Sequence, residues 1–170
     1  SFTPDGTRLV YSSWRNDTNR DGKIDFHDNT CLLMTEIDSR RETLLVPDRH
    51  NTLFPSLSPD GRHLLYLSRR RDTNHDGQID SLDNPGIFML DLSGRKERTL
   101  VMDDRYSTFP SFSPDGRHVL FLSSEPDAER EDAGESSAKR VGGYHSRKGI
   151  YRIGVGDRDP EQLISDRFLG

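Results

Sequence analysis

Two segments of the chain carry carboxylate and amide side chains at the spacing that a calcium ion requires. Residues 17–28 place oxygen-bearing side chains at segment positions 1, 3, 5, 9 and 12, with glycine at position 6, and residues 72–83 repeat this arrangement. Positions 1, 3 and 5 face inward on a tightly curved backbone, the glycine permits the bend, and position 7 offers its carbonyl oxygen. The expected ligands are Asp17, Asn19, Asp21, Lys23, Asp25 and Asp28 in the first segment, and Asp72, Asn74, Asp76, Gln78, Asp80 and Asp83 in the second, with Lys23 and Gln78 acting through their backbone.

The chemistry of these ligands favours calcium over other metals. Every expected ligand is an oxygen atom, which disfavours zinc and copper, and the flexible, carboxylate-rich spacing disfavours magnesium. The four carboxylates of each segment would also repel one another without a cation among them. We therefore expect two bound Ca²⁺ ions with a structural role; two acidic loops without ions are the alternative. Ile24 and Ile79, at position 8, are expected to pack the segments against the rest of the protein.

These segments resemble known calcium loops. The pattern is that of the EF-hand loop, except that position 12 is Asp28 or Asp83 where the EF-hand has Glu. It is similar to the dockerin variant of that loop and to the shorter loops of integrin-type propellers, in which position 9 is the last ligand. Direct and water-mediated coordination by Asp25 and Asp80 both remain open.

A second pattern determines the expected fold. A Ser/Thr-Pro-Asp-Gly sequence occurs three times, and its prolines, Pro4, Pro59 and Pro114, are each 55 residues apart. Proline presets the backbone of a tight turn, and glycine supplies the positive φ at its end. An alternating run of apolar residues follows each turn, as expected for a strand. Two further strands per repeat are predicted by the apolar runs 32–37, 87–92 and 150–155, and by the shorter pairs 45–46, 100–101 and 163–164.

Four short antiparallel strands per repeat are typical of β-propeller blades. The sequence therefore predicts an all-β protein of three four-stranded blades: residues 1–55 with the calcium loop 17–28, residues 56–110 with the calcium loop 72–83, and residues 111–170 with a long polar loop at 124–149. A single blade is apolar on both faces, so its neighbours must cover it.

The repeat resembles that of TolB-type propellers, which also occurs in prolyl oligopeptidase-like and tricorn-like proteins. The resemblance lies in the Phe-Ser-Pro-Asp-Gly-Arg run at 112–117 and its two counterparts, and it extends over all three repeats. It implies that each Pro-Asp-Gly turn joins the innermost strand of a blade to the second. Propellers have four to eight blades. Three blades therefore indicate either part of a larger propeller or half of a ring that two copies complete.

The remaining features narrow the function. A net charge of -5 with no basic stripe disfavours nucleic acid, and no apolar run is long enough to span a bilayer. No catalytic constellation stands out, and the single cysteine, Cys31, is expected in the core. We expect a non-catalytic, calcium-stabilised module that binds or scaffolds a protein partner, in the bacterial periplasm or at the cell surface. The alternative is the propeller portion of a larger hydrolase or polysaccharide lyase.

Overall fold

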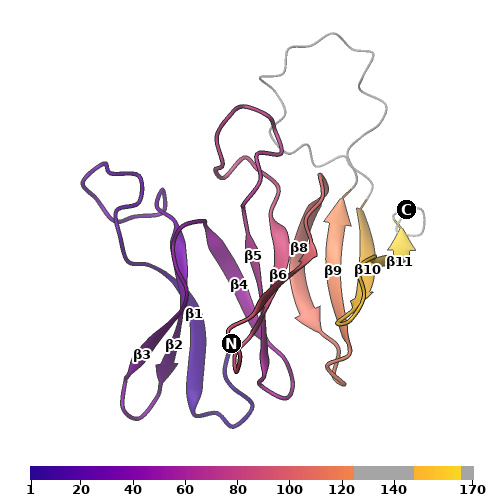
Figure 1. Ribbon diagram of the computed structural model, residues 1–170, viewed down its shortest axis with the longest axis horizontal. Helices are drawn as coiled ribbons and strands as arrows, with labels where there is room; N and C mark the ends of the chain where they lie inside the picture. Colours follow the sequence, from indigo (N-terminus) through magenta and orange to yellow (C-terminus); the bar gives the residue numbers. More distant parts are fainter. Residues whose placement is uncertain (125–147, 166–170) are drawn as a thin grey trace.

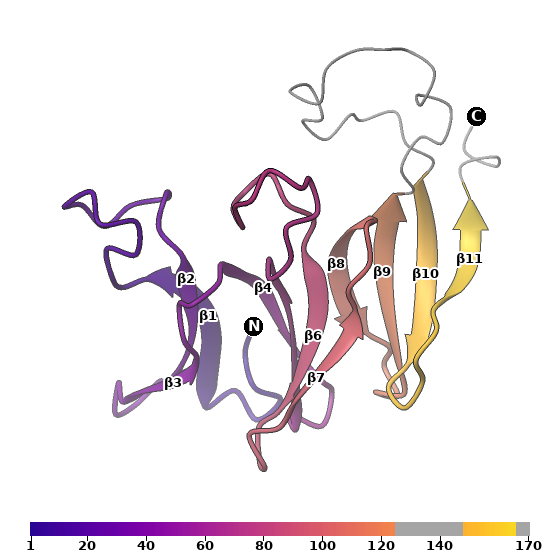
Figure 2. The ribbon, with the colours of Figure 1, turned by 45° about the horizontal axis from the view of Figure 1, so that its top comes forward.

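The computed structural model describes residues 1–124 and 148–165, and these residues form strands, turns and loops without a helix. The strands are β1 (Arg8–Trp14), β2 (Thr30–Glu36), β3 (Glu42–Val46), β4 (Thr52–Leu57), β5 (His63–Ser68), β6 (Gly86–Asp91), β7 (Glu97–Val101), β8 (Tyr106–Phe112), β9 (His118–Ser124), β10 (Lys148–Gly154) and β11 (Glu161–Ser165). Consecutive strands pair antiparallel within three sheets, β1-β2-β3, β4-β5-β6-β7 and β8-β9-β10-β11. The sheets stand side by side like the blades of a propeller (Figures 1 and 2). The all-β fold expected from the sequence is confirmed.

The blades differ from the expectation in two details. The first sheet has three strands, because only an isolated bridge between Phe2 and Leu9 occupies the position of its innermost strand. The expected repeat boundaries at 55/56 and 110/111 fall within β4 and β8, so the structural blades begin a few residues earlier. Most of the expected polar loop at 124–149 lies outside the described residues.

The Pro-Asp-Gly turns adopt the expected geometry at the end of each innermost strand. In the second blade, the N–H of Gly61 donates to the carbonyl of Ser58 at 2.9 Å, and Gly61 has a φ of 70°. The Asp60 carboxylate accepts hydrogen bonds from the Ser58 hydroxyl at 2.6 Å and from the N–H of Arg62 at 3.0 Å, which lower the pKa of Asp60. The same bonds recur in the other two turns. In the first turn they lower the pKa of Asp5 to about 2.

Two hydrophobic layers hold the blades together. The first layer lies between the β1–β3 and β4–β7 sheets and includes Val10 and Leu32 opposite Tyr66 and Phe88. The second lies between the β4–β7 and β8–β11 sheets, where Leu65, Leu67, Ile87 and Met89 meet Val119, Phe121, Tyr151 and Ile153. The middle blade is therefore covered on both faces, and Leu64, Leu65, Tyr66 and Ile87 have no exposed surface. Cys31 is buried and free, as expected.

The innermost strands β4 and β8 share an irregularity. Their pairing with β5 and β9 shifts register at a bulge that contains Phe54-Pro55 and Phe109-Pro110. Phe54 and Phe109 have φ values of 53° and 52°, which bulky side chains rarely adopt. Both rings are more than half exposed, and their centroids are 5.7 Å apart. Two neighbouring blades thus present a strained aromatic pair from their inner edges.

Candidate metal centres

Both candidate calcium loops lie at the same end of the blades. The first connects β1 to β2 and the second connects β5 to β6, and both extend beyond the strands, opposite the Pro-Asp-Gly turns (Figure 1). This placement follows from the antiparallel order of the blade, in which the second and third strands are joined at that end.

The first half of each loop is a turn organised by its own acidic side chains. The Asp17 carboxylate accepts hydrogen bonds from the N–H groups of Asp21 (3.1 Å) and Gly22 (2.8 Å). The side-chain amide oxygen of Asn19 accepts the N–H of Asp21 at 3.0 Å, and the Asp21 carboxylate accepts the N–H of Lys23 at 2.9 Å. Gly22 has a φ of 87°, which explains why glycine occupies position 6.

The second loop repeats this turn almost atom for atom. The Asp72 carboxylate accepts the N–H groups of Asp76 (3.2 Å) and Gly77 (2.8 Å), and Asn74 and Asp76 accept those of Asp76 and Gln78. Gly77 also has a φ of 87°. In both loops, the side chains at positions 1, 3 and 5 therefore lie around one curved stretch of backbone.

The aspartate at position 12 has a different role from the others. Asp28 and Asp83 are each only 1% exposed. One oxygen of Asp28 accepts the N–H groups of Thr18 (2.6 Å) and Asn19 (3.2 Å), and the other accepts the N–H of Asp25 (2.9 Å). These bonds, led by the one from Asp25, lower the pKa of Asp28. The carboxylate therefore ties the beginning of the loop to its end.

Asp83 makes the same connections in the second loop. It accepts the N–H groups of Thr73 (2.6 Å), Asn74 (3.4 Å) and Asp80 (2.9 Å). Burial alone would raise its pKa, but the hydrogen bonds from Asp80, Thr73 and Asn74 outweigh burial and lower the pKa.

Two threonines complete this closure, and the sequence reasoning did not single them out. The Thr18 hydroxyl donates to Asp28 at 3.1 Å and accepts the N–H of Asn29 at 2.7 Å. The Thr73 hydroxyl makes the same bonds to Asp83 and Asn84. The available signal was the presence of threonine at position 2 and asparagine at position 13 in both loops.

The donor set is compatible with a hard cation. Positions 1, 3 and 5 supply carboxylate and amide oxygens on one turn, and Asp25 and Asp80 follow at position 9, where each accepts one backbone N–H. The Asp25 carboxylate also lies 3.0 Å from the His27 ring nitrogen. Among residues 1–124 and 148–165, no three carboxylate, imidazole or thiol groups converge in a way that could hold a metal ion.

The expected packing of the position 8 isoleucines is wrong. Ile24 and Ile79 are 57% and 47% exposed, and their neighbours Phe26 and Leu82 are exposed as well. The loops project away from the sheets, so position 8 has no apolar surface beneath it. The hydrogen bonds of Asp28 and Asp83 hold the loops in place instead.

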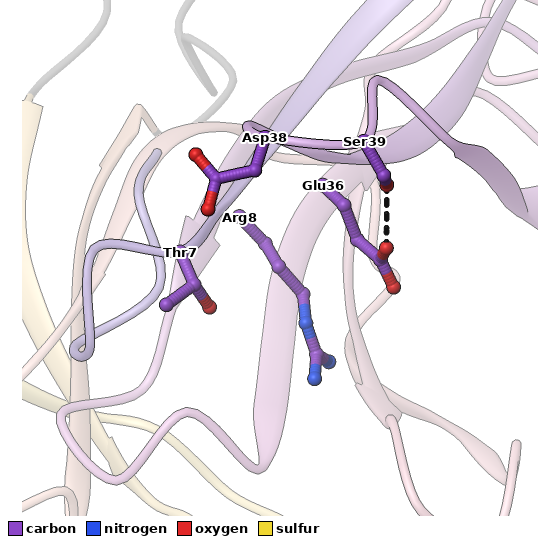
Figure 3. Close-up of a pocket in the computed structure, with 5 residues that line it drawn as sticks. All are labelled: Thr7, Arg8, Glu36, Asp38 and Ser39. Atoms are coloured by element: carbon purple, nitrogen blue, oxygen red, sulfur yellow. Dashed lines mark hydrogen bonds between the residues drawn. The ribbon is translucent and has the colours of Figure 1, made fainter.

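One shallow hollow lies at the opposite end of the first blade. It has a volume of about 220 Å³ and is lined by Thr7, Arg8, Glu36, Asp38 and Ser39 (Figure 3). The Ser39 hydroxyl donates to Glu36 at 2.7 Å, and the Arg41 guanidinium also contacts Glu36. These groups satisfy one another across the hairpin turn, where the Glu36 carboxylate is shared between the Ser39 hydroxyl and the Arg41 guanidinium.

Comparison with known proteins supports the fold. The putative TolB from Agrobacterium tumefaciens superposes with a TM-score of 0.62 and 20% identity over 96% of this chain and 47% of that chain. The fold is that of a TolB-like β-propeller. An oligogalacturonate lyase in complex with manganese aligns with a TM-score of 0.58 and 16% identity, over 96% of this chain and 38% of that chain.

Sequence comparison gives one partial relative. Dipeptidyl-peptidase 5 from Porphyromonas gingivalis is 37% identical over 79 residues, which are 45% of this chain and 11% of the peptidase. No family model matches the chain. The chain thus spans a small part of this relative and less than half of the structural neighbours. In the described part of the chain, no helix could cross a membrane.

Proposed function

We propose that the chain is a non-catalytic β-propeller module whose blades are stabilised by two Ca²⁺ ions and that binds or scaffolds a protein partner. The observation that carries the calcium proposal is the recurrence of one loop in two blades with the same hydrogen bonds and the same oxygen donors. Asp17, Asn19, Asp21 and Asp25 would hold one ion, and Asp72, Asn74, Asp76 and Asp80 the other, with the carbonyls of Lys23 and Gln78. Calcium would neutralise these carboxylates and rigidify the loops.

The burial of Asp28 and Asp83 assigns them a supporting role in this proposal. Both oxygens of each carboxylate already accept backbone N–H groups, so position 9 is better placed than position 12 to supply the last ligand. This arrangement favours the shorter loop type, in which position 9 closes the coordination shell.

Calcium titration by isothermal calorimetry tests the proposal. The wild-type chain is expected to bind two ions, and Asp21→Asn with Asp76→Asn is expected to bind none. Lys23→Ala is the matched control, because that residue would contribute only its backbone carbonyl. Wild-type melting curves that coincide with and without excess chelator, together with no heat of binding at millimolar calcium, would refute it.

The location and partner belong to the same proposal. Calcium sites of millimolar-range affinity are typical of extracellular modules, which favours the periplasm or the cell surface. The net charge of -5 disfavours nucleic acid as a partner and leaves proteins or further propeller blades.

A second candidate function follows from the partial relative. The 79 residues similar to Dipeptidyl-peptidase 5 favour a role as the propeller portion of a larger hydrolase. The structural similarity to an oligogalacturonate lyase adds the propeller portion of a polysaccharide lyase to this candidate. The coding sequence beyond residue 170 separates the candidates. A Gly-x-Ser-x-Gly segment between a strand and a helix supports the hydrolase, whereas more blades support the scaffold.

A further inference from the structure

The two candidate calcium loops are joined by a series of hydrogen bonds that crosses from the first blade to the second. The series starts at Thr30, at the beginning of β2 and directly after the first loop. It passes through Asn51, on the connection between β3 and β4, and continues through Arg69, directly after β5, to the carbonyl of Asp83 at the end of the second loop. We call these four residues the interloop network.

The first part of the interloop network is buried between the blades. The Thr30 hydroxyl donates to the side-chain oxygen of Asn51 at 2.8 Å, and the same oxygen lies 3.5 Å from the N–H of Thr30. The neighbouring Thr52 donates its hydroxyl to the Thr30 carbonyl at 2.7 Å and its N–H to the Thr30 hydroxyl at 3.0 Å. Thr30 and Thr52 are both buried. The end of the first loop is therefore fixed to the start of the second blade.

The second part of the interloop network reaches the base of the second loop. The N–H of Arg69 donates to the carbonyl of Asn51 at 3.4 Å, and the Nε of Arg69 donates to the carbonyl of Asp83 at 3.0 Å. The carboxylate of Asp83 in turn accepts the N–H groups of Thr73 and Asp80, which lie near the two ends of the loop. Arg69 thus connects Asn51 to the residue that closes the second loop.

The repeat provides an internal comparison for this network. One repeat of 55 residues further along, the positions of its first three members are occupied by Pro85, Tyr106 and Ser124. None of these residues keeps the side-chain hydroxyl, amide or guanidinium that the network uses at that position. The third blade also lacks the calcium-loop spacing. The side chains of the network are therefore found between two blades that both carry a loop, and they are replaced where the next blade has none.

We propose that the two loops bind calcium cooperatively, and that the interloop network couples them. This inference rests on the proposed calcium sites. An ion in the first loop orders the turn that Asp28 closes, and Thr30, Asn51 and Arg69 pass this order to the base of the second loop. The second ion then enters a loop that has less conformational entropy to lose, and the coupling is equal in both directions.

Electrostatic repulsion predicts the opposite sign. A bound cation disfavours a second cation nearby, and salt screens this repulsion between exposed sites. Positive cooperativity therefore distinguishes coupling through the network from the effect of charge alone.

Calcium titration by isothermal calorimetry measures the coupling. Asp21→Asn leaves only the second loop able to bind, and Asp76→Asn leaves only the first, so each variant gives a single-site binding constant. In the wild-type chain, the product of the two stepwise constants is expected to exceed the product of the two single-site constants about tenfold, a usual size for coupling between sites. Independent loops would give equal products.

Two substitutions test the route of the coupling. Arg69→Met removes the guanidinium and keeps the apolar stem, and Asn51→Ala removes the side-chain oxygen that faces Thr30. When either is combined with the wild-type loops and with both single-site variants, the excess is expected to fall below about twofold. Arg71→Met is the matched control, because Arg71 pairs with Asp104 at 3.2 Å, outside the network, and should leave the excess unchanged. Circular dichroism checks that each variant is folded.

The outcomes separate this inference from the proposed calcium sites. Equal products in the wild-type chain overturn the cooperativity but leave two metal sites in place. An excess that persists in both Arg69→Met and Asn51→Ala overturns the role of the network, as does an excess that Arg71→Met abolishes. A wild-type chain that binds no calcium refutes the metal sites and this inference with them.

Discussion

The buried carboxylate of Asp83 allows the roles of positions 9 and 12 to be separated by mutation. Asp83 accepts three backbone N–H groups from Thr73, Asn74 and Asp80 with its two oxygens. Asp83→Asn keeps the shape but replaces one oxygen by an NH₂ group, which then faces an N–H donor. Hydrogen bonds to charged groups contribute about 1.5–3 kcal/mol each, and an unsatisfied buried donor costs about 1–3 kcal/mol.

The expected loss of unfolding free energy is therefore about 2–4 kcal/mol, and it should occur in excess chelator. For a chain of this size, such a loss lowers Tm by roughly 10 °C. Urea denaturation followed by circular dichroism in EDTA measures the free energy, and calorimetric melting measures Tm.

The control is Asp80→Asn, three residues earlier in the same loop. Asp80 is exposed and accepts a single N–H, that of Leu82 at 2.7 Å. This variant is expected to change stability in EDTA by less than about 0.5 kcal/mol and to lose calcium binding at its loop. The reasoning is refuted if Asp83→Asn destabilises the chain only when calcium is present, because that result would make Asp83 a calcium ligand and not a residue that closes the loop by hydrogen bonds.

Three further outcomes are expected. Arg70 lies 4.0 Å from the centroid of the Phe88 ring and pairs with Glu97, so Arg70→Ala should cost about 2 kcal/mol in urea denaturation. Arg15 makes the corresponding ion pair with Glu42 in the first blade but is more exposed, so Arg15→Ala should cost clearly less; equal losses would contradict the role of burial. Acid should destabilise the fold, because the pKa values of the turn aspartates are lowered in the folded state, to about 2 for Asp5. Their contribution to stability is complete above the unfolded-state pKa of about 3.9 and is lost as the pH falls through the folded-state values. Urea midpoints that do not change between pH 5 and pH 2 would argue against this. Gly77→Ala should cost about 1 kcal/mol in EDTA, because a Cβ there meets no neighbour within 4 Å and only the φ of 87° opposes it; a neutral result would show that the loop relaxes freely.

Much of the architecture could be predicted from the sequence because its local signals agree. Pro59, Asp60 and Gly61 specify a turn whichever blade surrounds it, and the three copies fixed the period. The apolar pairs such as Leu100 and Val101 placed the outermost strands correctly. The exact start of each blade was missed because β4 begins at Thr52, before a bulge at Phe54-Pro55 that breaks its alternation.

The loops were predicted in part, for a physical reason. The spacing of oxygen side chains locates the turn, because positions 1, 3 and 5 act on their own local backbone. It does not reveal what lies beneath the loop, so Ile24 was expected against a surface that is not there. The burial of Asp28 depends on the strands that flank the loop, and composition alone treats it as one more acidic ligand.

The bulges in β4 and β8 limit how the inner rim of the blades could recognise a ligand. Pro55 and Pro110 have no N–H, and the positive φ of Phe54 and Phe109 interrupts the regular strand hydrogen bonding at the same point. An extended chain from outside therefore finds no continuous row of donors and acceptors with which to form an additional strand. This interruption disfavours edge-to-edge pairing of β4 and β8 with strands of other chains. Specific recognition at the inner rim would depend on the two exposed phenylalanine rings.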